Sequence, residues 1–428
     1  MKVCVVGSGG REHALALALG RTADVVVAPG NPGIPGVTNQ GHRLSCSAAP
    51  AHQIEADLFV IGPEAPLVEG LADLLRAKGD AVFGPGSDGA RLEGSKAYMK
   101  EVLTVAGIPT AAYGTFSSVD DAIGFLHRLP GPWVVKTDGL ASGKGVLVTD
   151  SIQHAEADVR AKLSGEAFGA AGRVVVVEEG LVGTECSVHV LCDGRRIVPL
   201  AAARDYKRLS DGDTGPNTGG MGAVSAVGFV DDDVIGRIVD ECVEPLVGEL
   251  RRRGIDYRGV LYAGLMITAD GPRVLEYNVR FGDPETQVIM PRTGGDLASL
   301  LLDAASGRLV YSVADAGAAD GSEAAVCVVL ASRGYPGAVR KGDEIAGLDE
   351  AREVPGVTLD FAGVEMHGDT MVTAGGRVLG VTAVGPTLEE ARGRAYSACG
   401  CVGWEGMHYR RDIAAETAKS SQSSGSGS

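Results

Sequence analysis

Residues 273–286 of this chain read RVLEYNVRFGDPET, and this stretch decides the fold. Its apolar residues are types that fit a pleated, half-buried surface, so we expect a strand over Arg273–Phe281. Side chains alternate across a strand, which places Glu276, Asn278 and Arg280 on one face. A carboxylate beside an amide oxygen suits Mg²⁺, which takes few protein ligands and fills its shell with water and phosphate oxygens. Arg280 could bind an anion there, although such alternation also marks the solvated face of an ordinary strand.

The composition argues against several classes of protein. A chain of 428 residues is long enough for about two to four domains, and 45% hydrophobic residues can fill their cores. The net charge of −16 argues against a nucleic-acid partner, and no apolar run approaches the roughly 20 residues that span a bilayer. The eight cysteines form no CxxC pair, which indicates reduced and mostly buried thiols. We expect a soluble, cytoplasmic, monomeric protein without nucleic-acid or membrane partners, whose N-terminus is a strand and not a signal peptide.

Residues 1–100 alternate between short apolar runs and helical segments, which predicts a βαβ series with a parallel sheet. The predicted strands are Lys2–Val6, Asp24–Ala28, Leu58–Ile61 and Ala81–Phe83, and the predicted helices are Glu12–Leu19 and Leu67–Lys78. Ligands bind such sheets at the carboxyl ends of the strands, where three glycine-rich loops of this chain lie. These loops contain Gly9, Gly10, Arg11 and Glu12, then Asn31, then Gly62, Pro63 and Glu64.

The first of these loops is not a dinucleotide fingerprint. That fingerprint needs a third glycine where this chain has Glu12, and the second strand ends in Ala28-Pro29-Gly30 without an acid for a ribose. A glycine-rich loop at a helix N-terminus, with Arg11 beside it, suits a single phosphate. A plain tight turn is the alternative.

A predicted hairpin over residues 131–148 carries two lysines. Lys136 ends an apolar strand, where a lysine is costly unless an anion pairs with it. At the tip, Gly143, Lys144 and Gly145 would let backbone amides approach phosphate oxygens, although the spacing is not that of a Walker A loop.

A second pair of lysines lies on a predicted helix that runs from Lys96 to Ala106. Lys96 and Lys100 are four residues apart and share one helix face. The usual meaning of such a pair is a solvated face.

An apolar strand then ends in the acidic residues Glu178 and Glu179, with Leu181 and Glu185 beyond. Backbone groups at such a strand end could bind an adenine, and a carboxylate could bind ribose hydroxyls. An ordinary exposed acidic turn is the alternative. Residues from about 113 to 192 would form a small α+β lid.

The segment over residues 211–222, DGDTGPNTGGMG, is too glycine-rich and polar for a core element. Long loops without regular structure inside compact domains are usually functional, so Asp213 and Asn217 could hold a small polar substrate. A disordered surface loop is the alternative. Beyond it we expect one helix over Asp231–Arg253 and a strand over Gly259–Thr268 that pairs with the opening stretch.

Taken in order, these parts resemble an ATP-grasp ligase, and the longer motifs resemble the phosphoribosylamine–glycine ligases, also called glycinamide ribonucleotide synthetases. The resemblance covers about residues 1–412. It rests on VGSGGREHA (6–14), APGN (28–31), GPEAPL (62–67), LEGSK (92–96), KTDGLASGKG (136–145), Asp213–Gly222, YAGLM (262–266) and Arg280–Gln287.

This resemblance implies an α/β and α+β multidomain fold. An N-terminal parallel-sheet domain over residues 1–100 would precede an ATP-grasp domain over 101–307, which includes the lid. A small C-terminal α+β domain would occupy 322–412. Residues 413–428 end in a serine- and glycine-rich run that we expect to be a disordered tail or a cloning remnant.

The resemblance also implies an activity: ATP phosphorylates glycine, and the amine of 5-phosphoribosylamine displaces the phosphate, an early step of purine biosynthesis. The ATP site would comprise Lys96, Lys136, Gly143, Lys144, Gly145, Glu178, Glu179, Leu181 and Glu185. The substrates would be held by Gly9, Gly10, Arg11, Glu12, Asn31, Gly62, Pro63, Glu64, Asp213, Asn217 and Arg280. Glu276 and Asn278 would hold Mg²⁺ or Mn²⁺, and Arg280 and Lys144 would act in phosphoryl transfer.

Two departures from the family pattern affect this interpretation. Many ATP-grasp enzymes carry a second metal-binding acid on the strand before the metal motif, where this chain has Gly264-Leu265-Met266. The adenine segment has Gly180 where a bulky residue is common. Another ATP-grasp carboxylate–amine ligase, a biotin-dependent carboxylase subunit and a non-catalytic nucleotide-binding protein remain the alternatives.

Overall fold

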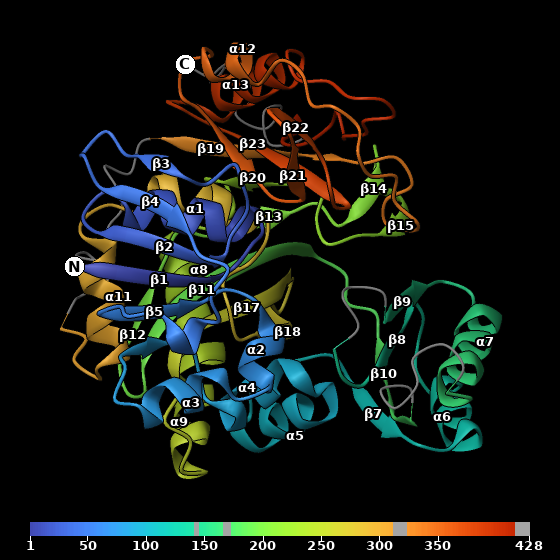
Figure 1. Cartoon of the computed structure of the whole chain (residues 1–428). Helices are drawn as coiled ribbons and strands as arrows, with labels where there is room; N and C mark the ends of the chain where they lie inside the picture. Colours follow the sequence, from blue (N-terminus) through green and yellow to red (C-terminus); the bar gives the residue numbers. More distant parts are fainter. Residues whose placement is uncertain (141–144, 166–172, 311–322, 416–428) are drawn as a thin grey trace, which may run out of the picture.

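The computed structural model describes residues 1–140, 145–165, 173–310 and 323–415 (Figure 1). It contains a parallel-sheet domain, a large antiparallel sheet and a small lobe that stands apart from both. Within the described ranges no helix has the length and apolar character needed to cross a membrane.

The N-terminal domain is built on a six-stranded sheet with the order β3-β4-β2-β1-β5-β6. All neighbouring strands in it are parallel except β3 and β4. The predicted parallel sheet is therefore confirmed, and the glycine-rich loops after β1, β2 and β5 meet at one edge. The strands are β1 (Lys2–Gly7), β2 (Asp24–Pro29), β3 (Gly36–Val37), β4 (Arg43–Cys46), β5 (Leu58–Ile61) and β6 (Val82–Phe83).

The helices of this domain differ from the prediction at one point. The single helix expected over Leu67–Lys78 is two helices, because Gly70 adopts a left-handed conformation with φ 87° between them. The domain contains α1 (Gly10–Leu19), a 3₁₀ turn (Ala51–Gln53), α2 (Glu64–Val68), α3 (Leu71–Ala77) and α4 (Ser87–Gly94).

The separate lobe at the lower right of Figure 1 corresponds to the first part of the predicted lid. It ends with β10, and residues 184–192, which were expected within the lid, belong to a strand of the large sheet. The antiparallel sheet of the lobe has the order β7-β10-β8-β9, and two helices pack on it around a small apolar core of its own. The predicted hairpin is confirmed, because β8 and β9 pair from Trp133 with Thr149 to Lys136 with Val146. The elements are β7 (Tyr113–Phe116), α6 (Val119–Leu126), β8 (Trp133–Thr137), β9 (Val146–Thr149), α7 (Ile152–Leu163) and β10 (Val175–Glu179). Helix α5 (Lys96–Ala106) precedes the lobe, and the Ser95 side chain caps its N-terminus.

The central and C-terminal parts of the chain share one sheet. Its order is β18-β17-β11-β13-β16-β19-β23-β20, with β12 beside β11. Strand β19 of the C-terminal part pairs with β16 over four residues, so the two parts are joined by backbone hydrogen bonds. The strands are β11 (Thr184–Asp193), β12 (Ile197–Pro199), β13 (Ala203–Asp205), β16 (Gly222–Ser225), β17 (Arg258–Thr268), β18 (Gly271–Asn278), β19 (Ala324–Ala331), β20 (Val357–Phe361) and β23 (Arg377–Gly385).

Residues 273–278 lie in strand β18, which differs from the predicted strand in two respects. The strand ends at Asn278, so Arg280 lies beyond it and not on its face. A register shift against β17 lies between Glu276 and Val274, and it leaves Leu275 as an extra, bulged residue.

The single helix expected over Asp231–Arg253 is also interrupted. It comprises α8 (Asp232–Ile238), a π-helical turn (Val239–Val243) and α9 (Glu244–Arg252). Pro245 lacks the N–H that would continue the helical pattern, which explains an interruption at this point. The carbonyl of Cys242 in the turn accepts a hydrogen bond of 2.5 Å from the hydroxyl of Tyr277 on β18.

The segment over 211–222 is more regular than expected. It takes part in a hairpin of β14 (Arg208–Ser210) and β15 (Thr214–Asn217) and reaches the start of β16. The disordered tail expected from residue 413 begins too early, because Ile413 and Ala414 are fully buried. Residues 416–428, the rest of that expected tail, lie outside the described residues. The remaining elements are α10 (Glu285–Ile289), a 3₁₀ turn (Met290–Arg292), α11 (Leu297–Ala305), α12 (Leu348–Arg352), β21 (Val364–His367), β22 (Thr370–Thr373) and α13 (Leu388–Cys399).

Asp360 on β20 is a buried acid that should make the stability of the fold depend on pH. Its carboxylate accepts a hydrogen bond of 2.6 Å from Thr382, and burial raises its pKa from 3.8 to about 8. Between these values the folded protein keeps a proton that the unfolded chain releases, so stability falls as pH rises. Asp360→Asn removes this titrating group. We predict that its free energy of unfolding, relative to that of the wild type, increases by at most about 4 kcal/mol as the pH rises from 5 to 8. Urea unfolding at both pH values measures this gain, and parallel pH profiles would contradict it.

Candidate active site

The polar face of the large sheet carries the predicted metal residues. Glu276 lies opposite Gly264, which in turn lies opposite Ser187 on β11. Asn278 lies opposite Tyr262 in the same way. A Cβ at position 264 would stand 3.3 Å from Cγ of Glu276, so the glycine leaves room for the carboxylate. Strand pairing therefore places Glu276 and Asn278 on one surface at the β18 edge of the sheet.

Four cationic side chains act on Glu276. Burial opposes its ionisation, but Lys207, Lys136, Lys96 and Arg280 outweigh burial and hold the pKa of Glu276 below its ordinary value. Lys207 lies in the loop after β13, Lys136 on β8, Lys96 on α5 and Arg280 in the segment after β18. The structure thus brings three predicted site residues, Lys96, Lys136 and Arg280, to the predicted metal residue.

Lys136 connects the lid to the metal-motif strand. Its ammonium lies 3.0 Å from the Glu178 carboxylate and donates to the carbonyl of Leu275, also at 3.0 Å. Leu275 is the bulged residue, and the bulge frees its carbonyl from the strand ladder. Lys136 has the anionic partner that its place at the end of an apolar strand predicts, and that partner is Glu178.

Lys100 is not on a solvated face, contrary to the sequence analysis. Its side chain is 0% exposed and forms an ion pair of 3.0 Å with Glu178. The i,i+4 spacing gave the correct helix face, but sequence spacing does not reveal what packs against that face.

Lys96 ties the start of α5 to the tip of the lid hairpin. Its Nζ donates to the Gly139 carbonyl at 2.9 Å, and Asp138 accepts a hydrogen bond of 3.1 Å from the Ala97 amide. Gly145 stands just before β9, where its carbonyl accepts from the Thr137 amide. Gly143 and Lys144 lie outside the described residues.

The predicted adenine segment is held by backbone contacts. The Glu179 carboxylate accepts a hydrogen bond of 2.8 Å from the Ala112 amide, and the Gly180 amide donates to the Pro132 carbonyl at 2.6 Å. A Cβ on Gly180 would lie 2.5 Å from Cγ of Pro132, so no side chain fits there. Pro132 takes the space that a bulky residue would fill. Leu181 follows, half-buried.

Glu185 faces Lys207, a residue to which the sequence analysis gave no role. The Lys207 ammonium lies 3.0 Å from Glu185 and 3.6 Å from Asp205. Burial raises the pKa of Asp205, although Lys207 opposes this rise. The alternation of Asp205 and Lys207 beside a predicted site was the signal that could have identified them.

Arg280 is clamped between acids of two segments. It lies 3.3 Å from Glu64 at the start of α2 and 3.1 Å from Glu93 on α4. Its guanidinium also donates to the Asn278 amide oxygen at 3.4 Å. Arg280 therefore links a loop of the N-terminal domain to the metal residues. Glu93 is a further residue without a predicted role.

The first glycine-rich loop is organised by the Glu12 carboxylate. It accepts hydrogen bonds of 2.6 Å from the Gly9 amide and from the Arg11 guanidinium. It also fills the space beside Gly62, where a Cβ would lie 2.0 Å from its oxygen. Glu12 thus joins two predicted substrate loops, and Gly10 and Pro63 stand beside them in the chain.

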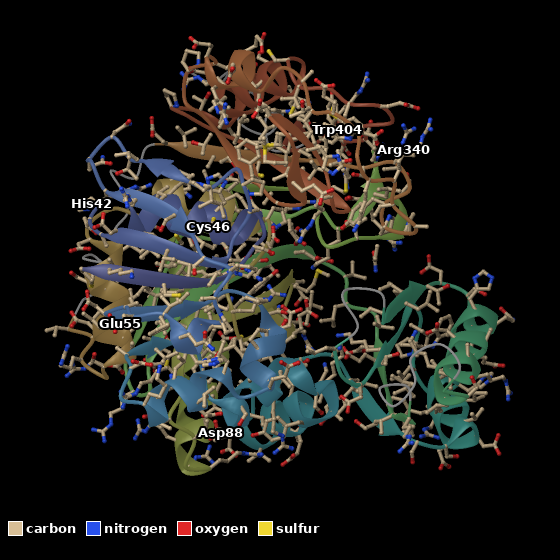
Figure 2. All side chains as sticks on the ribbon, in the orientation of Figure 1. His42, Cys46, Glu55, Asp88, Arg340 and Trp404 are labelled. Carbon is tan, nitrogen blue, oxygen red and sulfur yellow. The ribbon has the colours of Figure 1, made fainter. Side chains whose placement is uncertain are left out.

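Asn31 fixes the second loop to its neighbours. Its amide donates to the carbonyls of Ser8 and Phe361, both at 2.9 Å. The half-buried thiol of Cys46, labelled in Figure 2, donates to the Asn31 carbonyl at 3.3 Å. Asn31 therefore joins the N-terminal domain to β20 of the C-terminal part.

Asp213 and Asn217 lie on the β14–β15 hairpin, away from the contacts around Glu276. Asp213 forms an ion pair of 2.6 Å with the buried Arg410. Asn217 pairs with Arg208 across the hairpin and lines a shallow hollow of about 560 Å³ that β9 also borders. The contacts give Asp213 a partner in the C-terminal part of the chain.

Glu276 and Asn278 fit a divalent cation that draws most of its ligands from a nucleotide. Among the described residues, no three His, Cys, Asp or Glu side chains converge as metal ligands. One carboxylate and one amide oxygen are the oxygen donors that Mg²⁺ takes when phosphates and water complete its shell. The residues present therefore fit such an ion bound together with ATP.

A parallel-sheet domain, an antiparallel lid and lysines from both sides of the joint define the class of ATP-grasp enzymes. Comparison with family models matches the phosphoribosylglycinamide synthetase N domain over residues 1–93, its ATP-grasp (A) domain over 94–286 and its C domain over 325–416. The chain belongs to the phosphoribosylglycinamide synthetase family.

Individual relatives agree over nearly the whole chain. A phosphoribosylamine–glycine ligase of Streptomyces coelicolor is 48% identical, covering 98% of this chain and 100% of the relative. One from Vibrio cholerae is 46% identical, covering 96% and 97%. A solved phosphoribosylamine–glycine ligase from Thermotoga maritima superposes with a TM-score of 0.81 at 38% identity, covering 96% and 100%. A biotin carboxylase from Campylobacter jejuni, at 12% identity and a TM-score of 0.70 over 98% and 95% of the chains, shares the fold alone.

The packing of Glu12 against Gly62 predicts that this glycine is required. A methyl group in Gly62→Ala would also lie 2.8 Å from the Val6 carbonyl, so the loop must shift. We predict a loss of about 1–3 kcal/mol in the free energy of unfolding, measured in urea. Gly36→Ala is the matched control, because its methyl group meets nothing within 4 Å. Equal unfolding midpoints for the two variants would mean that Glu12 moves aside without cost.

Proposed function

We propose that this protein joins glycine to 5-phosphoribosylamine with ATP, giving glycinamide ribonucleotide, ADP and phosphate, a step of purine biosynthesis. The observation that carries the proposal is the gathering of Lys96, Lys136 and Arg280 around Glu276, beside the glycine-rich loops of the N-terminal domain. Membership of the family supports the choice of substrates.

In the first step, a carboxylate oxygen of glycine attacks the γ-phosphorus of ATP, and ADP leaves. Such a transfer needs positioning and cations more than covalent help from the protein. Lys96, Lys136 and Lys144 would hold the phosphates, with the amides of Gly143 and Gly145 beside them. Arg280 would bind the transferring phosphoryl group. Mg²⁺ or Mn²⁺, held by Glu276 and Asn278, would neutralise phosphate charge when bound.

The nucleoside end of ATP would lie at the joint between the lid and the large sheet. Glu179 and Leu181 would meet adenine through their backbones beside Glu178. Glu185 would bind the ribose hydroxyls. The contacts of Glu179 with Ala112 and of Gly180 with Pro132 support a rigid adenine segment.

In the second step, the amine of 5-phosphoribosylamine attacks the acyl carbon of glycyl phosphate. An amide bond forms, inorganic phosphate leaves, and the attacking nitrogen loses a proton. Gly9–Glu12, Asn31 and Gly62–Glu64 would hold this substrate. The contact of Glu64 with Arg280 supports a short path between the two substrates. Asp213 and Asn217 stay candidates for the glycine end.

We further propose the domain limits given above for residues 1–100, 101–307 and 322–412, and a cytoplasmic monomer that binds neither nucleic acid nor membrane. The net charge of −16 supports the absence of a nucleic-acid partner.

ADP release by the purified protein tests the choice of substrates. With ATP and Mg²⁺ present, glycine and phosphoribosylamine are omitted in turn. We expect full turnover only when both are present, because each step consumes one of them. Release that ignores both, or that requires a different carboxylate such as bicarbonate, would leave an ATP-grasp enzyme of another specificity.

Glu276→Gln tests the metal assignment. It keeps the size of the side chain but removes the charge, and we predict a loss of turnover of at least about a hundredfold. The thermal unfolding midpoint should stay within a few degrees of wild type. Asp270→Asn, at the exposed β17–β18 turn, is the matched control and should turn over normally. Undiminished ligation by Glu276→Gln would remove the metal assignment.

A further inference from the structure

Three buried charges lie in a row between α5 and the lid. Glu178 forms an ion pair with Lys100 through one carboxylate oxygen and an ion pair with Lys136 through the other, each at 3.0 Å. The exposed fractions of the side chains are 0% for Lys100, 2% for Glu178 and 7% for Lys136. These three residues, named here the charge triad, are therefore largely out of water.

The net charge of the triad decides what Lys136 can offer an anion. A carboxylate next to a single lysine cancels most of the attraction that the lysine exerts on a more distant anion. Burial strengthens this cancellation, because less water lies between the paired charges to screen them from each other. With Lys100 present, two cations face one anion and the triad keeps one positive charge. Burial lowers the pKa of Lys100 to about 8, against the opposing effect of Glu178, so Lys100 is protonated at neutral pH.

Lys100 itself is anchored to the strand of the metal motif. Its ammonium donates to the Thr110 hydroxyl at 2.7 Å, and that hydroxyl donates to the Val274 carbonyl at 2.6 Å. The Val274 amide in turn donates to the Pro109 carbonyl at 2.8 Å. Lys136 meets the same strand one residue later, at Leu275. The triad thus bridges the chain segment that enters the lid and the strand that carries Glu276.

We propose that Lys100 and Glu178 are positioning residues for ATP. Glu178 holds Lys136 in place, and Lys100 offsets the charge of Glu178, so that Lys136 presents its positive charge to the phosphates. This inference deepens the proposed function and rests on the role given there to Lys136.

The test combines removal of one charge with removal of both. Lys100→Met leaves Glu178 to neutralise Lys136, and we expect binding of MgATP to weaken at least about tenfold, with a smaller change in kcat. Lys100→Met combined with Glu178→Gln restores the net charge of the triad, and it should bind MgATP more tightly than Lys100→Met alone. A purely structural role predicts that the second substitution lowers the affinity for MgATP further. The proposal is therefore overturned if the double variant binds MgATP as weakly as Lys100→Met, or more weakly.

A matched control separates this role from the loss of a buried lysine in general. Lys162 on α7 of the lid is 2% exposed and paired with Asp158, outside the proposed site. Lys162→Met should keep the affinity for MgATP even where its unfolding temperature falls. Titration calorimetry gives the affinity, and thermal unfolding confirms that each variant is folded. If Lys100→Met does not fold, Glu178→Gln alone replaces it: normal MgATP affinity and KM there would overturn the proposal.

Lys136→Met distinguishes failure of the inference from failure of the proposed function. It should weaken MgATP binding in any case. If it does not, the ATP role of Lys136 is wrong and the inference falls with it. If it does while Lys100→Met binds normally, only the triad inference is wrong.

Discussion

The site depends on the cost of placing positive charges close together away from water. Three of the four cations around Glu276 each have a carboxylate within about 3 Å: Lys136 has Glu178, Lys207 has Glu185 and Arg280 has Glu93. Charges that are paired in this way can be partly buried. An unpaired cation at the same position would either become neutral or turn toward solvent. The paired acids come from the lid, the large sheet and the helices after the N-terminal sheet, so the site forms only when these parts are assembled.

The C-terminal part of the chain holds the substrate loops in place through contacts from β20 and β23. The Phe361 amide donates to Nδ1 of His13 at 2.9 Å, and the Phe361 carbonyl accepts from Asn31. Arg377 on β23 forms an ion pair of 2.7 Å with Asp283, just beyond the metal strand. Because β19 extends the same sheet that carries Glu276, these contacts keep a fixed relation to the site. A unit that carries none of the proposed site residues therefore still determines where the loops stand.

Two irregularities of the backbone have identifiable uses at the site. The bulge at Leu275 frees the carbonyl that Lys136 binds. The Cys242 carbonyl, in the π-helical turn before Pro245, accepts from the hydroxyl of Tyr277, whose side chain lies on the other face of the same strand. Bulges and π-turns often occur beside functional sites, because they redirect groups that a regular element would use internally.

Sequence alone determined what depends on neighbouring residues. Alternation, turn residues and apolar runs gave the parallel sheet, the lid hairpin and the strand with Glu276 and Asn278. The position of the glycine-rich loops at one sheet edge followed from topology. Tertiary structure decided what depends on distant partners: the burial of Lys100, the lack of space beside Gly180, and the acids that clamp Arg280. Periodicity shows which face of an element a residue occupies, but whether water, a proline or a carboxylate meets that face is settled only when segments far apart in the chain are packed together.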